Sequence, residues 1–154
     1  MKKLKFLLSM ILIISVSACG YSRLNDQSNE LKFNNIEING DKRLAYILKN
    51  KLTLLSKTES KNTYDLSINL TNSKASKIRD ATGKTTRFNL VLSGDLKLTT
   101  NNKVVYNRMF TVNNDYDVSK NHSKTIRNEK NSMQNNVDAL SEEIAKYIQL
   151  INLN

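Results

Sequence analysis

Apolar residues recur along the chain with two different periods, and these periods predict four strands and two helices. Alternation of apolar and polar residues predicts strands over residues 31–38, 64–71, 88–98 and 104–112. Apolar residues at spacings of three, four and seven predict helices over residues 42–56 and over about 119–150. The predicted order of elements is therefore β-α-β-β-β-α.

This order predicts an α+β fold, a two-layer sandwich in which about four strands form a sheet that two helices cover on one face. The last three strands follow one another directly, which predicts an antiparallel meander, and residues 100–103 (Thr-Asn-Asn-Lys) predict its tight turn. Gly94 interrupts a long strand and predicts a bulge or bend. Asp41 is a suitable N-cap for the first helix. The last helix has few apolar residues in its first half, so we expect only its second half to pack fully.

The first eighteen residues have the pattern of a cleaved export signal. Three lysines precede a mostly apolar run over residues 6–16, which is about half the roughly 20 residues that a membrane-spanning helix needs. Small residues then lead to Cys19, the only cysteine in the chain. The segment Val16-Ser17-Ala18-Cys19 resembles the bacterial lipobox, and this resemblance implies lipid on Cys19. An ordinary signal peptide is the alternative, but a lone thiol is awkward in an exported protein because it can form no internal disulfide.

We therefore divide the chain into a lipoprotein signal peptide (residues 1–18), a polar tether that carries the lipid (19–30) and a single domain (31–154). Removal of the signal leaves 136 residues, which is the size of one domain. Several acyl chains anchor a protein stably, whereas one chain binds only marginally. We expect the mature protein to be held at a membrane through Cys19.

The charge balance favours an anionic partner. The precursor has 24 Lys and Arg against 14 Asp and Glu, and the loss of three lysines with the signal leaves a formal charge of +7. For an exported lipoprotein this surplus suits phosphorylated lipid or an acidic protein more than nucleic acid, and arginine-rich nucleic-acid motifs are missing. Asn and Lys are frequent throughout, so part of the charge can reflect the composition of the genome.

A basic stretch precedes the strand 88–98, in the predicted connection between two strands. Its members are Lys74, Lys77, Arg79, Lys84 and Arg87, and only Asp80 opposes them within the stretch. Arginine binds phosphate through paired hydrogen bonds and lysine binds it as a point charge. The stretch is therefore a candidate phosphate-binding loop. The alternative is a solvated loop that the charges keep soluble.

Residue types for catalysis or metal binding are sparse. His122 is the only histidine and lies in a polar stretch, and no Cys-x-x-Cys pair, His-x-x-x-His pair or acidic calcium loop occurs. We expect no metal and no cofactor. A Gly-x-Ser-x-Gly motif is also missing. The pattern favours a binding or assembly protein over an enzyme, and a lipid-anchored hydrolase with His122 as its base is the enzymatic alternative.

Several short patterns, in their order and spacing, resemble the LPS-assembly lipoprotein family LptE of the Gram-negative outer membrane. The mature start Cys19-Gly20-Tyr21 resembles the opening of that family. Residues 78–87, Ile-Arg-Asp-Ala-Thr-Gly-Lys-Thr-Thr-Arg, are similar to its arginine-containing strand connection. A strand that ends in Tyr116-Asp117 and a helix that begins near Asn128-Glu129 complete the resemblance, which spans nearly all of the mature chain.

The resemblance implies a domain that sits inside and plugs the LptD β-barrel at the periplasmic face of the outer membrane. It implies a role in assembling that barrel and in delivering lipopolysaccharide to the outer leaflet, without catalysis. It also implies that Arg79 contacts lipopolysaccharide, with Lys77, Lys84 and Arg87 as further candidates. The basic position of the family on its last helix has no clear match, because Asn135 and Asn136 lie near it. A free-standing periplasmic or surface ligand-binding lipoprotein is the alternative function.

Overall fold

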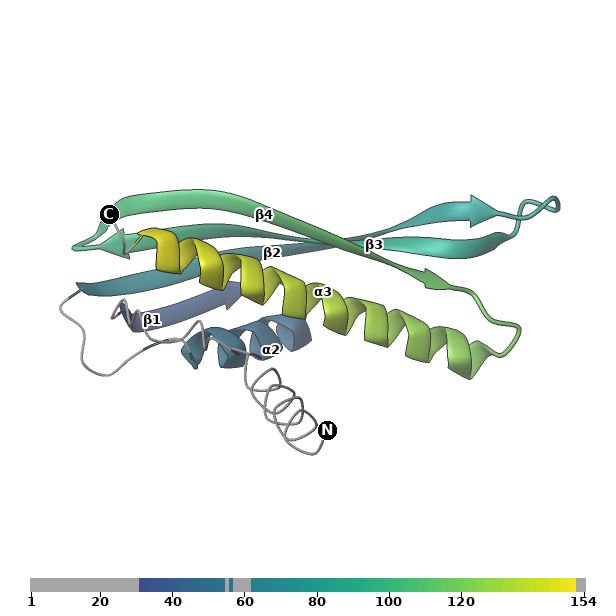
Figure 1. The fold of residues 1–154 in the computed structure, drawn as a ribbon, viewed down its shortest axis with the longest axis horizontal. Coiled ribbons are helices and arrows are strands. Elements are labelled where there is room, and N and C mark those ends of the chain that lie inside the picture. The colour runs from purple at the N-terminus through teal and green to yellow at the C-terminus, as the bar shows by residue number, and fades with distance from the viewer. Residues whose placement is uncertain (1–30, 55, 57–61, 152–154) are drawn as a thin grey trace, which may run out of the picture.

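The protein folds as a mixed four-stranded sheet with two helices on one face, which confirms the predicted α+β sandwich (Figure 1). The computed structural model describes residues 31–54, 56 and 62–151, so the predicted signal peptide, Cys19 and the tether lie outside the described residues. The elements are β1 (Leu31–Asn39), α2 (Lys42–Thr53), β2 (Asn62–Arg79), β3 (Thr85–Thr100), β4 (Lys103–Asp117) and α3 (His122–Ile151).

The strands follow one another across the sheet in chain order, β1-β2-β3-β4. β1 runs parallel to β2, and β2, β3 and β4 form the antiparallel meander that the sequence predicts. Asn101 and Asn102 close the β3–β4 turn with φ of 51° and 60°. Two-residue hairpin turns require positive φ at both positions, which Asn tolerates better than most residues, so the predicted tight turn is confirmed.

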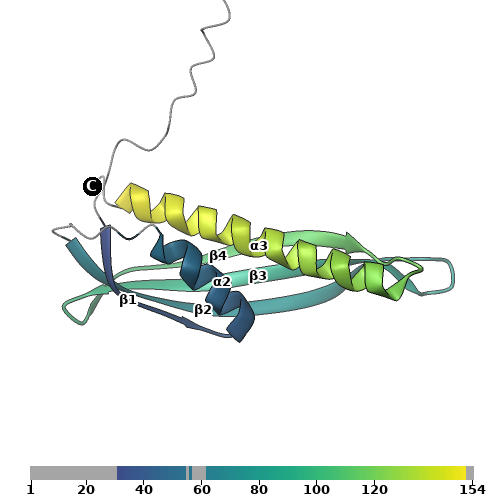
Figure 2. The ribbon, with the colours of Figure 1, turned by 90° about the horizontal axis from the view of Figure 1, so that it is seen from below.

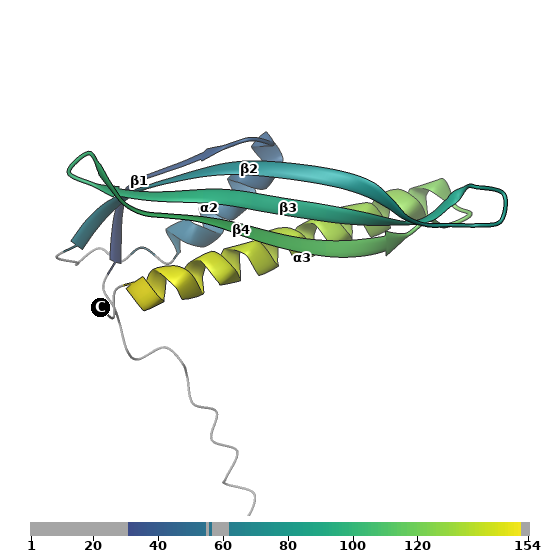
Figure 3. The same cartoon turned by 90° about the horizontal axis from the view of Figure 1, so that it is seen from above.

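The core lies between the sheet and the two helices. Figure 2 shows α2 and α3 on the same side of the sheet, and Figure 3 shows the other side, which no described helix covers. Leucines and isoleucines from alternate positions of the strands point toward the helices and are buried, while Ser67, Ser93 and Thr111 lie on the opposite face. The helices contribute buried apolar rows: Leu44, Leu48, Leu52, Val137, Leu140, Ile144 and Ile148.

The junction between β1 and α2 depends on two neighbouring residues. Gly40 has φ of +123°, and a Cβ there would lie 2.5 Å from the main-chain oxygen of Leu70 on β2, so a side chain cannot be accommodated. Asp41 is the N-cap, because its Oδ1 accepts hydrogen bonds of 3.0 Å from the main-chain nitrogens of Arg43 and Leu44. The predicted cap is therefore confirmed, and the helix is slightly shorter than predicted because it ends at Thr53.

Gly94 does not form the predicted bulge. It pairs with Leu70 on β2 and with Phe110 on β4, and neither register shifts at this point. A Cβ at Gly94 would lie 3.4 Å from both Ile68 and Leu140. Gly94 therefore marks the point where α3 packs closely on the sheet, and the missing side chain allows that close approach.

α3 packs through its second half, as predicted. Its buried residues begin at Ser132 and end at Ile148, while the preceding turns are more exposed. Three of these buried residues are polar, and Asn136 is the most deeply buried of them. It donates its Nδ2 hydrogen to the main-chain oxygen of Leu90 on β3, at 3.0 Å. This bond satisfies an amide that would otherwise be costly to bury, and it ties the middle of the helix to the middle of the sheet.

Candidate functional site

The basic stretch forms the distal part of a long β2–β3 hairpin, not a loop. Lys74, Lys77 and Arg79 belong to β2, Arg87 belongs to β3, and only residues 80–84 connect the two strands. The sequence predicts shorter strands because residues 71–79 are exposed on both faces and show no apolar alternation. Cross-strand pairing with β3 holds this segment extended without a buried face.

The hairpin tip is a compact turn that Asp80 organises. Its Oδ1 accepts hydrogen bonds from the hydroxyl of Thr82 (2.6 Å), the main-chain nitrogen of Thr82 (2.9 Å) and the main-chain nitrogen of Lys84 (3.0 Å). The hydrogen bond from the Thr82 hydroxyl has the largest effect on the pKa of Asp80, and these bonds together lower that pKa below its ordinary value. Arg79 reaches across the turn and donates from Nη1 to the main-chain oxygen of Gly83, at 3.2 Å. The tip therefore carries Arg79 and Lys84 at the two ends of a defined turn.

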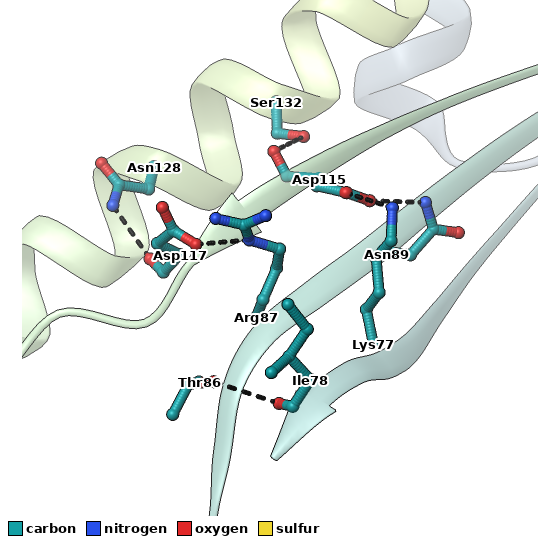
Figure 4. Close-up of polar contacts among 9 residues, drawn as sticks. All are labelled: Lys77, Ile78, Thr86, Arg87, Asn89, Asp115, Asp117, Asn128 and Ser132. Carbon is teal, nitrogen blue, oxygen red and sulfur yellow. Dashed lines mark hydrogen bonds and ion pairs between the residues drawn. The ribbon is translucent and has the colours of Figure 1, made fainter. Parts of the chain in front are cut away.

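Behind the tip, Lys77 is engaged by an acidic residue of β4. Its ammonium group donates to Asp115, and the amide of Asn89 on β3 donates to the same carboxylate at 2.8 Å (Figure 4). The hydrogen bond from Lys77, and then that from Asn89, lower the pKa of Asp115 below its ordinary value. Lys77 is therefore paired across three strands rather than free for a ligand.

Arg87 is paired in the same way. Its Nε donates to Oδ1 of Asp117 at 2.6 Å, and the two residues are register partners on β3 and β4 (Figure 4). This hydrogen bond raises the pKa of Arg87 above its ordinary value. Exposed pairs of this kind contribute little to stability, but a bound phosphate has to compete with the carboxylate for the same guanidinium.

Lys74 lies on the helix side of the hairpin. Its Nζ is 2.9 Å from Oε1 of Glu129 on α3 and sits 4.5 Å from the ring centre of Phe88 and 5.2 Å from that of Tyr116. Burial acts to lower the pKa of Lys74, but Tyr116 and Glu129 together raise it above its ordinary value. Lys74 therefore joins the hairpin to the first half of α3.

Folding thus changes the charge of the predicted site. Asp115, Asp117 and Glu129 come from β4 and α3 and pair with Lys77, Arg87 and Lys74, respectively. Sequence reasoning missed these three acidic residues, although the alternation Asp-Tyr-Asp at 115–117 on a strand antiparallel to β3 was a usable signal. Within the described ranges, Arg79 and Lys84 are the members of the stretch without a carboxylate within salt-bridge distance.

A polar groove of about 400 Å³ runs between the end of β4 and the first half of α3. Asn128 donates to the main-chain oxygen of Asp117 (3.0 Å) and Ser132 to that of Asp115 (3.4 Å), which attaches the helix to the edge strand (Figure 4). Asn135 lines the groove, whereas Asn136 is buried and bonded to β3. The LptE resemblance implies a basic residue near this position of the last helix. This protein presents an uncharged amide there instead.

The other candidate sites that the sequence raises concern His122 and metal-binding side chains. His122 is the exposed first residue of α3. The described residues contain no group of three or more His, Cys, Asp or Glu side chains that could hold a metal ion. No described helix is both long and apolar enough to cross a membrane.

Comparison with known proteins gives the fold but no family. No family model and no curated protein matches the sequence. The rare lipoprotein B of Shewanella oneidensis has a similar structure, with a TM-score of 0.58 and 13% identity over 79% of this chain and 98% of that chain. A Caulobacter crescentus chain described as a lipoprotein gives a TM-score of 0.57 and 18% identity over 79% of this chain and 91% of that chain.

A third neighbour is the minor lipoprotein of Acinetobacter baumannii, with a TM-score of 0.54 and 18% identity over 77% of this chain and 88% of that chain. All three neighbours are bacterial lipoproteins, and each is covered along most of its length. At these identities the likeness shows that the chain shares their fold.

Proposed function

We propose that this protein is an outer-membrane lipoprotein of the LptE type that plugs and helps assemble an LptD-type β-barrel. It aids the delivery of lipopolysaccharide to the outer leaflet and catalyses no reaction. The observation that carries the proposal is the fold shared with bacterial lipoproteins along almost their whole length. The lipobox-like segment before Cys19 and the LptE-like patterns along the sequence agree with it.

The polarity of the sheet supports a role as a plug. Transmembrane barrels have a polar interior, so a domain inside one needs polar side chains on the surface that meets the wall. Figure 3 shows the face of the sheet that the helices leave open. By the alternation along the strands, this face carries such residues, among them Ser67, Ser93, Asp95 and Thr111. A free-standing lipoprotein tolerates this face equally well, so the barrel has to be sought by experiment.

The length of the hairpin supports a role in delivery across the membrane. The 16 residues of β3 span about 50 Å at the usual rise per residue, which compares with about 40–45 Å for a whole bilayer. β1 begins at the end of the sheet opposite the hairpin tip, so the chain leading from Cys19 enters there (Figure 1). An anchor in the inner leaflet therefore leaves Arg79 and Lys84 near the height of the outer leaflet.

The test is affinity purification of the tagged, lipidated protein from detergent-solubilised outer membranes. We expect a barrel protein of much larger mass to co-purify, and an unrelated outer-membrane lipoprotein with the same tag is the control. Recovery of the protein by itself would overturn the proposal. A stable monomer in that case would favour the free-standing ligand-binding lipoprotein.

A further inference from the structure

Several chain segments end together at one end of the sheet, which we name the tether end. The register places the start of β1 beside the start of β2, and Asp65 of β2 beside Thr99 at the end of β3. Thr99 in turn pairs with Val104 at the start of β4. The hairpin tip, residues 80–84, lies at the opposite end (Figure 1).

Both helices also finish at the tether end. The hydroxyl of Ser56, just beyond α2, accepts a hydrogen bond from the main-chain nitrogen of Phe33 on β1, at 3.0 Å. Tyr147 in the last turns of α3 packs edge-on against Phe110 of β4, with ring centres 5.4 Å apart. The first contact holds the carboxyl end of α2 next to the start of β1. The second attaches α3 to the middle of β4, and Figure 1 shows α3 continuing from there toward the tether end.

Large apolar side chains are exposed at this end. Leu54, after the last turn of α2, is 86% exposed, and Leu150 of α3 is 61% exposed. Val104 and Val105 of β4 are 58% and 40% exposed. These four make up half of the eight large apolar side chains that are strongly exposed among the described residues, and the other four are spread over the rest of the surface. Apolar groups gathered at one end commonly mark a contact surface.

Two lysines lie among these apolar residues. Lys103 is the first residue of β4 and precedes Val104, and Lys146 lies one helical turn before Leu150 on the same side of α3. Neither ammonium is within salt-bridge distance of a carboxylate among the residues that the structure describes. Exposed apolar side chains with lysines beside them are a composition that favours binding at the interface of an anionic membrane.

The position of the anchor identifies the occupant of this surface. Residues 19–30 separate Cys19 from β1, and twelve residues reach at most about 40 Å even when fully extended. The tether end is therefore the part of the domain that stays nearest to a membrane that holds the lipid. Once the lipid has inserted, the short tether keeps the tether end at a high effective concentration near the membrane. Even a weak contact between the protein surface and the membrane is then populated.

We propose that the tether end is a membrane-docking surface that inserts Leu54, Leu150 and Val104 among the headgroups of an anionic bilayer. The inference rests on the lipidation of Cys19 in the proposed function. Docking through these residues holds the tether end at the membrane surface that carries the lipid, which is also the position of the tether end in the proposed function. The orientation of Arg79 and Lys84 is then set by the protein surface as well as by the lipid.

The test places a polarity-sensitive dye at single positions of the full mature, lipidated protein. Cys19 is the only cysteine, and in the proposed form its sulfur carries lipid, so an introduced cysteine is the one reactive thiol. Leu54→Cys and Val104→Cys report on the tether end. Ile126→Cys is the matched control, because Ile126 is an exposed apolar residue at the other end of α3. The membranes are vesicles of phosphatidylethanolamine with a minority of phosphatidylglycerol.

We expect the emission of the dye at Leu54 and Val104 to shift to shorter wavelength on addition of vesicles, and that at Ile126 to stay unchanged. Equal emission at all three positions, with the protein floating normally with the vesicles, would overturn the docking surface and leave lipidation intact. Failure of the unaltered protein to float with the vesicles would overturn lipidation and the docking surface together.

Discussion

The guanidinium of Arg87 and the carboxylate of Asp117 meet across β3 and β4, with Nε 2.6 Å from Oδ1, although the residues are 30 positions apart. Lys77 and Asp115 meet in the same part of the sheet. The two pairs neutralise half of the four candidate residues that the sequence assigns to phosphate. They leave the hairpin tip as the part of the basic stretch with charge available to a ligand.

The first prediction compares two double variants in binding to phosphorylated lipid A. Arg79→Ala with Lys84→Ala removes the two cations without a salt-bridge partner, and we expect affinity to fall about tenfold or more. Lys77→Ala with Arg87→Ala removes cations that already have carboxylate partners, so we expect a smaller loss. A pull-down on immobilised lipid A measures the affinities, with circular dichroism as the control for folding. Equal losses would show that the tip has no special role.

The second prediction concerns acid stability. The folded-state pKa of Asp115 lies below its unfolded value of 3.8, so its interaction stabilises the fold above pH 3.8 and is lost as the pH falls through the lowered pKa. Asp115→Asn removes the titrating group. We expect the urea midpoint of this variant to fall less than that of the unaltered protein between about pH 5 and about pH 2.

Lys77→Met provides the matched test of this linkage, because it removes the first cause of the lowered pKa. Its acid-induced loss of stability should also be smaller than that of the unaltered protein. An unaltered acid dependence in both variants would contradict a stabilising role of the Lys77–Asp115 pair.

The third prediction separates two adjacent asparagines of α3. Asn136→Ala removes the hydrogen bond to the main-chain oxygen of Leu90 and leaves a small cavity, so we expect the free energy of unfolding to fall by about 1–3 kcal/mol. Asn135 is exposed, and Asn135→Ala should change the free energy of unfolding by less than about 0.5 kcal/mol. Urea unfolding measures both values, and similar costs would place Asn136 outside the core.

The fourth prediction tests the close packing at Gly94. Gly94→Ala adds a Cβ at 3.4 Å from Ile68 and Leu140, which is van der Waals contact, so the free energy of unfolding should change by less than about 1 kcal/mol. Gly94→Leu overfills the same space and should lower it by about 1–3 kcal/mol. Thermal unfolding checks the pair. A Leu variant as stable as the Ala variant would show that α3 does not press on this point.

The fifth prediction addresses the enzymatic alternative. His122→Ala should leave the barrier function of the outer membrane intact in a strain that depends on this protein, because an assembly role needs no base at the exposed start of α3. Resistance to a bulky antibiotic measures that barrier. Loss of resistance with normal protein levels would favour the hydrolase.

Local patterns predicted much of this fold. The periods of apolar residues, Asp41 at the start of α2 and the Asn101-Asn102 turn each act within a few residues, so their outcome can be read from the sequence. Two local signals were misread. The segment 71–79 of β2 lacks apolar alternation because it has no buried face. Gly94 suggested a bulge or bend in the sequence, but close approach of a helix also requires a missing side chain.

The candidate site shows where local reasoning stops. The sequence by itself determined the export signal pattern, the layered α+β fold and the cluster of basic residues. Only the tertiary structure decided which of those cations keep their charge free, because strand register brought Asp115 and Asp117 to Lys77 and Arg87. It also gathered Leu54, Val104 and Leu150 at the tether end, since the ends of separate elements become neighbours only when the chain has folded.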